Sequence, residues 1–122
     1  MPAANLSFDP LTEAEKEQED IITVLVDHDI AGLIPDFLQS IRDQTLRLSE
    51  LLHENNYEDI RIIGHSLKGV GGGYGFQRIT DLGAQIEQAA KSRRRDGIEV
   101  GIADLRDYLE RVQIIFKNAP VF

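Results

Sequence analysis

A histidine and a lysine stand three residues apart, just before a run of glycines. His65 and Lys68 are followed by five of the ten glycines of the chain, all between Gly69 and Gly75. An unperturbed imidazole has a pKa of about 6.5, so near neutral pH most of it is unprotonated and nucleophilic. A lysine ammonium one helical turn away can contact the oxygens of a phosphoryl group on such a ring. The pair is therefore a candidate for phosphoryl chemistry on histidine.

The glycines do not match a nucleotide-binding loop. The pattern GxxxxGK[ST] is absent, and GxGxxG fails because Tyr74 occupies the position of its final glycine. No strand is predicted before the segment, whereas both loops follow a strand. Inside a helix each glycine costs about 1 kcal/mol relative to alanine. The cluster therefore indicates a surface that must stay free of side chains.

Helical periodicity predicts that His65 is exposed. With about 100° per residue and Ile60 at zero, an apolar stripe falls between about 280° and 360°. This stripe comprises Ile60, Ile63, Leu67, Val70 and Tyr74. His65 lies at about 140°, on the opposite side of the same wheel. We predict a partner-docking face around it that consists of Arg61, Ile62, Gly69, Gly72 and Gly73.

Four amphipathic stripes must position this segment. Besides the stripe that begins at Ile60, three more follow helical spacing: Ile34, Leu38, Ile41, Thr45, Leu48 and Leu52; Phe76, Ile79, Leu82, Ile86 and Ala89; Ile102, Leu105, Leu109, Val112 and Phe116. Asn55-Asn56 and Asp96-Gly97 are the predicted breaks, Pro35 is placed in a first helical turn and Pro120 marks the end. Short connections between four such helices predict an all-α, antiparallel up-down-up-down four-helix bundle.

The segments at the margins of these helices are less regular. Ile21–Val26 is rich in β-branched residues, but no second strand is predicted to pair with it. A short N-terminal helix or an extended segment on the bundle is therefore expected. The basic cluster Arg93–Arg95 is interpreted as a solvated helix end whose cations oppose the C-terminal dipole.

Composition excludes several classes of protein. The chain has 122 residues and a formal charge of −8, and residues 1–20 carry six acids against one lysine. These residues are predicted to be an acidic, flexible tail with a nascent helix over 11–20, and residues 21–122 to be one domain. A nearly neutral body does not favour nucleic acid. No apolar run reaches the roughly 20 residues that span a bilayer. The absence of cysteine excludes thiolate chemistry, and no export signal is visible, so a cytoplasmic location is expected.

The sequence His65-Ser66-Leu67-Lys68-Gly69, with the later Gly75, resembles the His-x-x-Lys-Gly pattern of histidine-containing phosphotransfer (HPt) domains. The resemblance covers residues 21–118 and implies an antiparallel helical bundle with the phosphorylated histidine on its second helix. By resemblance His65 is the phosphoacceptor, Lys68 stabilises the phosphate and Gly69 keeps the site accessible. Members often carry a glutamine where this chain has Glu87. A carboxylate there would repel the phosphoryl group unless Lys91, at i+4, neutralises it.

The resemblance implies a phosphocarrier without an ATP site or autokinase activity. It would pass a phosphoryl group between His65 and receiver-domain aspartates of response regulators or a hybrid sensor histidine kinase. No cofactor is expected, any Mg²⁺ would come from the receiver partner, and a monomer is expected. Two other classes of function are the alternatives. A pure interaction module would not require the His65–Lys68 pair. A metal-dependent hydrolase lacks ligands, because His28 belongs to a turn and His53 to a helix end.

Overall fold

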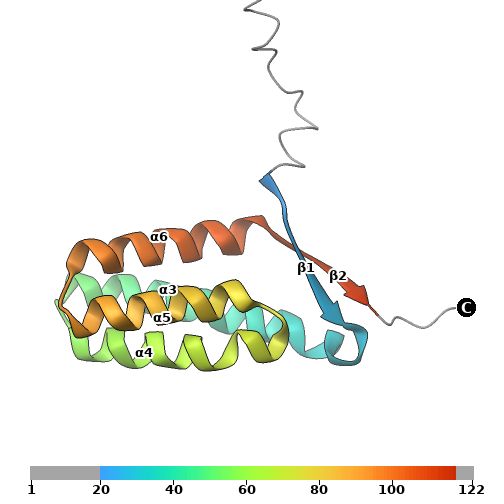
Figure 1. The fold of residues 1–122 in the computed structure, drawn as a ribbon, viewed down its shortest axis with the longest axis horizontal. Coiled ribbons are helices and arrows are strands. Elements are labelled where there is room, and N and C mark those ends of the chain that lie inside the picture. The colour runs from blue at the N-terminus through green and yellow to red at the C-terminus, as the bar shows by residue number, and fades with distance from the viewer. Residues whose placement is uncertain (1–19, 118–122) are drawn as a thin grey trace, which may run out of the picture.

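The described part of the protein is a bundle of four helices, with one strand before the first helix and one after the last. The structure is a computed structural model and describes residues 20–117, so most of the predicted nascent helix over 11–20, and Pro120, lie outside the described residues. The long helices are α3 (Ile34–His53), α4 (Tyr57–Val70), α5 (Gln77–Lys91) and α6 (Arg95–Arg111). Figure 1 shows the chain running along α3, turning back along α4, and then following α5 and α6 in the same alternating way. The predicted helical bundle is confirmed.

Helix boundaries follow local sequence signals. Pro35 stands in the first turn of α3, where its missing N–H leaves no bond unmade. The side chain of Asn56 caps α4 by accepting a hydrogen bond from the backbone N–H of Asp59 at 3.1 Å. The apolar stripes of the four helices meet in one core, whose fully buried members include Leu48, Leu51, Ile60, Leu67, Phe76, Ile79, Leu82, Ile86, Ile98 and Leu105.

Helices α4 and α5 approach each other closely because glycines face each other across their contact. A Cβ atom on Gly64 would lie 2.7 Å from the backbone nitrogen of Glu87, and one on Gly83 would clash with the backbone nitrogen of Lys68. The buried residues of α4 are Ile60, Gly64 and Leu67. Val70, which the helical wheel placed in the core, lies outside this buried set and is 37% exposed. Tyr74 is half-buried in the short 3₁₀ helix η2 (Gly72–Tyr74) and stacks on Phe37.

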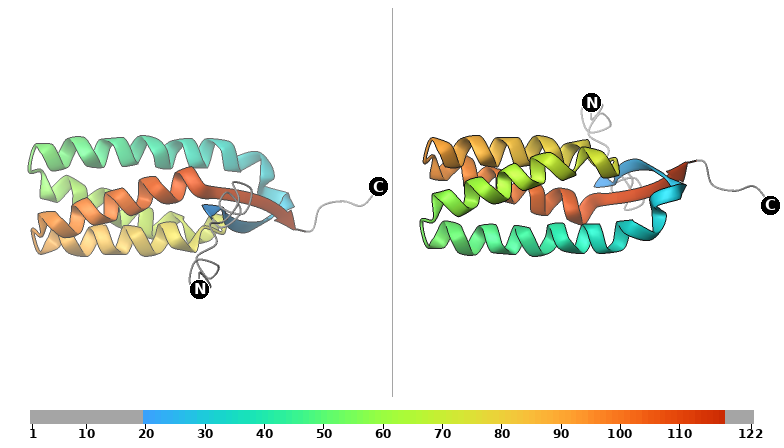
Figure 2. Two further views of the ribbon diagram at one scale, coloured as in Figure 1. Left: turned by 90° about the horizontal axis from the view of Figure 1, so that it is seen from above. Right: turned by 90° about the horizontal axis from the view of Figure 1, so that it is seen from below.

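A parallel two-stranded ribbon joins the two ends of the chain, so the all-α prediction was incomplete. Strand β1 (Ile22–Asp27) pairs with β2 (Val112–Lys117), with Ile22 opposite Val112. Of the two conformations expected for this segment, a short helix or an extended segment, the structure has the extended one as a strand, and the expectation that no partner strand exists was wrong. Val112 and Phe116 belong to this ribbon and not to the last helix. Figure 2 shows the ribbon continuing beyond one end of the bundle, where the 3₁₀ helix η1 (His28–Leu33) connects it to α3.

The turn between α5 and α6 also differs from the prediction. Helix α6 begins at Arg95 and includes Asp96-Gly97, so the chain breaks at Ser92–Arg94 instead. Arg95 is the first residue of α6, so it does not lie at a helix C-terminus as the sequence interpretation of Arg93–Arg95 had it. Its Nη1 donates to the carbonyl oxygen of Leu52 at 2.9 Å and to Oδ1 of Asn55 at 2.7 Å, which ties the end of α3 to the start of α6. The Cζ atom of Arg93 lies 5.6 Å from the ring centroid of Tyr57, over the face of the ring.

None of the helices within residues 20–117 is long and apolar enough to cross a bilayer.

Candidate functional site

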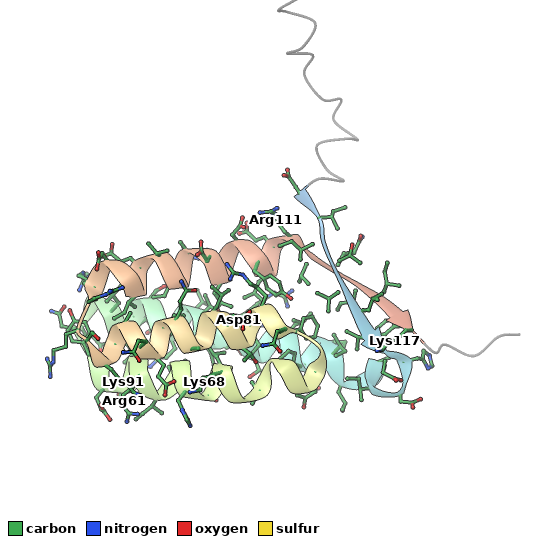
Figure 3. All side chains as sticks on the ribbon, viewed as in Figure 1. Arg61, Lys68, Asp81, Lys91, Arg111 and Lys117 are labelled. Carbon is green, nitrogen blue, oxygen red and sulfur yellow. The ribbon has the colours of Figure 1, made fainter. Side chains whose placement is uncertain are left out.

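His65 stands on the exposed face of α4, near the middle of the bundle. Its side chain is 67% exposed, as the helical wheel predicts. Leu67 and Gly64, on the other side of the same helix, are buried. Figure 3 shows Arg61 and Lys68 of α4 and Lys91 of α5 along the same flank of the bundle. The site is thus a histidine that solvent and a second molecule can reach, with positive charge beside it.

The carboxylate of Glu87 joins the two candidate catalytic side chains. Its Oε2 lies 2.8 Å from Nδ1 of His65, and its Oε1 lies 2.9 Å from Nζ of Lys68. Glu87 comes from α5 and is only 5% exposed. The absence of a side chain on Gly64 brings the backbone of α5 close enough for this contact. One nearly buried carboxylate therefore binds both residues from the neighbouring helix.

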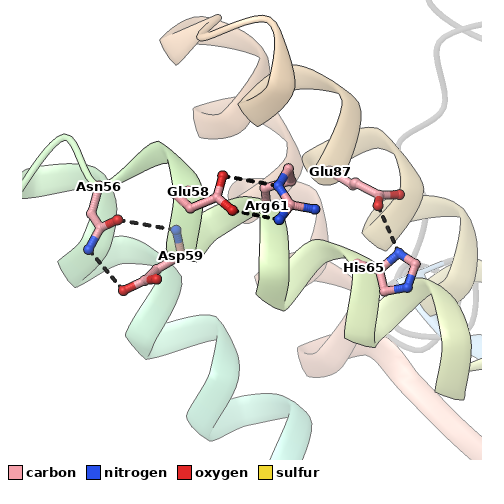
Figure 4. A network of polar contacts seen from close by, with 6 residues as sticks. All are labelled: Asn56, Glu58, Asp59, Arg61, His65 and Glu87. Carbon is pink, nitrogen blue, oxygen red and sulfur yellow. Dashed lines mark hydrogen bonds and ion pairs between the residues drawn. The ribbon is translucent and has the colours of Figure 1, made fainter.

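The protonation state of this carboxylate determines the tautomer of the histidine. Lys68 and His65 hydrogen bond to Glu87 and lower its pKa to about 2, against the opposing effect of its burial, and Lys91 adds a smaller electrostatic contribution. An ionised carboxylate can only accept hydrogen bonds. The proton of the neutral imidazole must then reside on Nδ1, which leaves the lone pair on Nε2. In Figure 4 the ring turns one nitrogen toward Glu87 and the other away from it.

The structure corrects the expected role of the charges around Glu87. From the sequence, Glu87 would repel a phosphoryl group unless Lys91 neutralised it; Lys91 does lower the pKa of Glu87, but Lys68 is the cation that contacts the carboxylate and lowers this pKa more. Lys68 is correspondingly bound and does not project freely beside His65. Sequence reasoning also missed the direct contact of Glu87 with the histidine ring. One feature of the sequence could have indicated this contact. Glu87 lies between Ile86 and Ala89 of an apolar stripe, and a carboxylate that is buried with them requires a charged partner.

The predicted docking residues lie around His65 but differ in how open they are. A Cβ atom added to Gly69 or Gly73 would meet nothing within 4 Å, whereas one on Gly72 would lie 3.2 Å from Oε1 of Gln77. Ile62 is 50% exposed. Arg61 is half-buried, and its Nε donates to Oε2 of Glu58 at 3.1 Å, so this guanidinium is already paired. The bond and the nearby positive charge lower the pKa of Glu58.

Metal-ligating side chains do not converge in the described part of the chain. No group of three His, Asp or Glu residues with suitable geometry occurs within residues 20–117. His28 begins η1 and packs its ring edge on Phe116, and His53 is the last residue of α3. The three histidines therefore lie on separate elements.

The fold and the site define a helical domain that presents one oriented histidine to a partner. A family model described as Hpt domain matches residues 32–114, a span that contains all four long helices, the histidine and Glu87. No curated protein and no solved structure matches the chain. The chain belongs to the Hpt domain family, whose members carry phosphoryl groups on histidine in phosphorelays and interact there with receiver domains and kinases. The resemblance seen in the sequence is confirmed.

Proposed function

We propose that the protein accepts a phosphoryl group on Nε2 of His65 from a receiver-domain aspartate or a kinase, and passes it to the aspartate of a response regulator. The observation that carries this proposal is the bond between Nδ1 of His65 and Glu87, which leaves Nε2 as the free nucleophile on an exposed ring. The resemblance to HPt domains identifies His65 as the phosphoacceptor. The contact of Nδ1 with Glu87 indicates that Nε2 is the ring nitrogen that would accept the phosphoryl group.

The chemistry requires no proton transfer on the protein. The lone pair of Nε2 attacks the phosphorus of an aspartyl phosphate, the N–P bond forms, and the P–O bond to the aspartate breaks, so that the aspartate leaves as a carboxylate. The ring then carries the phosphoryl group on Nε2 and a proton on Nδ1, and is therefore positively charged. Glu87 Oε2, 2.8 Å from Nδ1, balances this charge. Transfer to the next aspartate reverses the same steps.

Lys68 is proposed to stabilise the phosphoryl oxygens while it remains close to Glu87. Its Nζ lies 2.9 Å from Oε1 of Glu87, on the same carboxylate that holds the histidine. An ammonium has three donors, so it can bind this carboxylate and a phosphoryl oxygen together. The ion pair also offsets the negative charge of Glu87 close to the site. The repulsion expected of a carboxylate at this position is reduced in this way.

The open surface at Ile62, Gly69, Gly72 and Gly73 is proposed to receive the receiver domain, with Arg61 at its edge. We further propose that the protein is a phosphocarrier without enzymatic activity of its own and without a cofactor, since the receiver partner would supply any Mg²⁺. Three expectations stay predictions: a monomeric state, a cytoplasmic location, and a domain over residues 21–122 preceded by an acidic tail over residues 1–20.

A phosphotransfer assay tests the proposal. The full chain is incubated with a receiver domain that carries a radioactive aspartyl phosphate, and the label on the chain is followed. We expect label that acid removes and base does not, as for phosphohistidine, and none on His65→Gln. Circular dichroism should show an unchanged fold in this variant, because the ring lies in solvent. Label that survives in His65→Gln would overturn the assignment, and docking without any label would favour the interaction module.

A further inference from the structure

A groove runs between α3 and α6, the two helices that do not carry the candidate site. Its wider part encloses about 530 Å³ and is lined by Arg42, Thr45, Leu46, Arg106, Leu109 and Glu110. Arg106 also lines a second hollow of about 210 Å³ farther along the same two helices, toward Arg95. Both hollows lie between α3 and α6 and share Arg106, whose side chain reaches across to Ser49 of α3; the two hollows together are called the groove below.

The groove combines apolar surface with unneutralised positive charge. Leu46 is 62% exposed at its edge. Arg106 donates to the hydroxyl oxygen of Ser49 at 3.2 Å, a neutral partner. Within residues 20–117 neither Arg106 nor Arg42 forms an ion pair with a carboxylate. Glu110 is the one acid in the wider part, and at the far end Arg95 is paired with Glu99. A segment with both carboxylates and apolar side chains fits such a surface.

The chain enters the described structure beside the C-terminal end of α6. The carbonyl oxygen of Asp20 accepts a hydrogen bond from Nε of Arg111 at 2.6 Å. Figure 3 shows Arg111 at the end of α6, where β1 lies beside it. Asp20 and Glu110 line the same hollow, and Glu110 also lines the groove. Asp20 therefore lies near the end of α6 at which Glu110 lines the groove.

The segment before Asp20 has the matching chemistry and sufficient length. Residues 1–19 contain five acids and a single lysine, together with the apolar residues Phe8 and Leu11. From Glu110 back to Arg95 the groove follows α6 for about 22 Å at 1.5 Å per residue. Nineteen residues span about 28 Å as a helix and more when extended, so the segment reaches along the whole groove.

We propose that the acidic segment of residues 1–19 binds in the groove between α3 and α6. Its carboxylates neutralise Arg42 and Arg106, and its apolar side chains cover Leu46 and Leu109. The segment would then occupy the side of the bundle formed by α3 and α6, and the glycine surface around His65 on α4 would stay open for a receiver domain. This contact is independent of phosphoryl transfer.

A nitroxide label on the segment tests the contact in the full chain. The chain contains no cysteine, so Ala14→Cys gives a single attachment point. We expect the label to broaden the amide signals of Thr45, Leu46 and Arg106 at least about fivefold more than those of Ile62 and Gly69 on α4, because the groove raises the local concentration of the segment. Equal broadening on both sides of the bundle would overturn the proposal.

Charge variants give the matched control. Arg42→Gln combined with Arg106→Gln should abolish the selective broadening, and so should about 0.5 M salt, because the attraction is screened. Arg47→Gln removes an exposed arginine of the same helix that pairs with Glu50 outside the groove, and should leave the broadening unchanged. Broadening that survives the double variant would contradict the role of the two arginines. Broadening that appears only between labelled and unlabelled chains would assign the groove to a second copy instead.

Discussion

Glu87 of α5 reaches across the helix contact and holds Nδ1 of His65 at 2.8 Å, while its other oxygen holds the ammonium of Lys68 at 2.9 Å. A carboxylate in this place is the main departure of the chain from the glutamine expected by resemblance. A neutral amide could accept the same Nδ1–H bond but could not balance the charge of the phosphorylated ring. Under the proposed function, the identity of residue 87 should therefore affect both the tautomer of His65 and the stability of its phosphorylated form.

Substitutions at Glu87 separate these two effects. Glu87→Gln keeps an oxygen acceptor for Nδ1–H, whereas Glu87→Ala removes it. We expect phosphoryl acceptance to fall by about tenfold to a hundredfold in Glu87→Ala, the usual cost of losing the group that orients a functional histidine, and by less in Glu87→Gln. Nitrogen NMR of the ring should show the Nδ1–H tautomer in the wild type and a mixture in Glu87→Ala. Equal rates in all three proteins would show that the tautomer is not controlled from residue 87.

The low pKa of Glu87 gives the folded state a defined acid response. Its pKa falls from 4.5 to about 2 on folding, so the unfolded chain binds the proton more readily. The contribution of ionised Glu87 to the free energy of unfolding is complete above pH 4.5 and is lost as the pH falls toward 2. Glu87→Gln cannot titrate. The difference in melting temperature between the wild type and this variant should therefore shrink steadily between about pH 4.5 and pH 2. A difference that stays constant down to pH 2 would contradict the ion pairing described for Glu87.

The parts of the site that lie on one helix could be predicted from sequence. The exposure of His65 and Ile62 follows from a rotation of about 100° per residue, which depends only on local backbone geometry. The bond to Glu87 depends on how far α5 slides along α4 and how closely the two pack. That distance is set by Gly64 and Gly83, whose packing role is invisible in a single-helix wheel.

The ribbon could not be predicted because its pairing joins opposite ends of the chain. Val112 and Phe116 are four residues apart, a spacing that continues the helical stripe of α6 and also places both on one face of a strand. Only the partner strand, Ile22–Asp27, distinguishes a helix from a strand here. Ile22 pairs with Val112, which is 90 residues later in the sequence. Periodicity within one window carries no information about such a contact.

Lys68→Ala should weaken transfer without abolishing it. The substitution removes the proposed charge-assisted contact to the phosphoryl oxygens in a site that water reaches, which corresponds to about a tenfold lower rate. It also leaves Oε1 of Glu87 without its ammonium, so the remaining carboxylate charge would oppose the incoming phosphoryl group. Lys68→Arg should recover part of the rate. The rates come from single-turnover transfer from the phosphorylated receiver, and a wild-type rate in Lys68→Ala would show that its ammonium does not contact the transferring group.

Two glycines of similar sequence context should respond in opposite directions to alanine. A Cβ atom on Gly83 would meet the backbone of Lys68 and lie 2.8 Å from the carbonyl oxygen of Gly64, so Gly83→Ala must force α4 and α5 apart. We expect a loss of about 1–3 kcal/mol in the free energy of unfolding, the usual cost of overpacking. Gly69→Ala has open space and should gain up to about 1 kcal/mol through helix propensity. Urea denaturation measures both, and a destabilised Gly69→Ala would show that this position is not free.

A bulky residue at Gly69 tests whether the bare surface serves access by a protein partner. Gly69→Gln adds a side chain at a position where nothing lies within 4 Å, so the fold should tolerate it. The new side chain would stand one helical turn from His65, in the space that a receiver domain needs. Transfer from the phosphorylated receiver should slow by at least about tenfold, because a blocked docking contact weakens association. Gly32→Gln, on η1 and equally open, is the matched control and should transfer normally.

A small phosphodonor distinguishes obstruction of the partner from damage to the histidine. Phosphoramidate needs no docking surface, so if it labels His65 in the wild type it should label Gly69→Gln at nearly the same rate. Only the receiver-dependent reaction should then be slow. An equal loss with both donors would mean that Gly69 shapes the histidine itself, through the helix or through the position of Lys68. No loss with either donor would place the docking surface elsewhere on the bundle, and the open face at Gly69 and Gly73 would need another explanation.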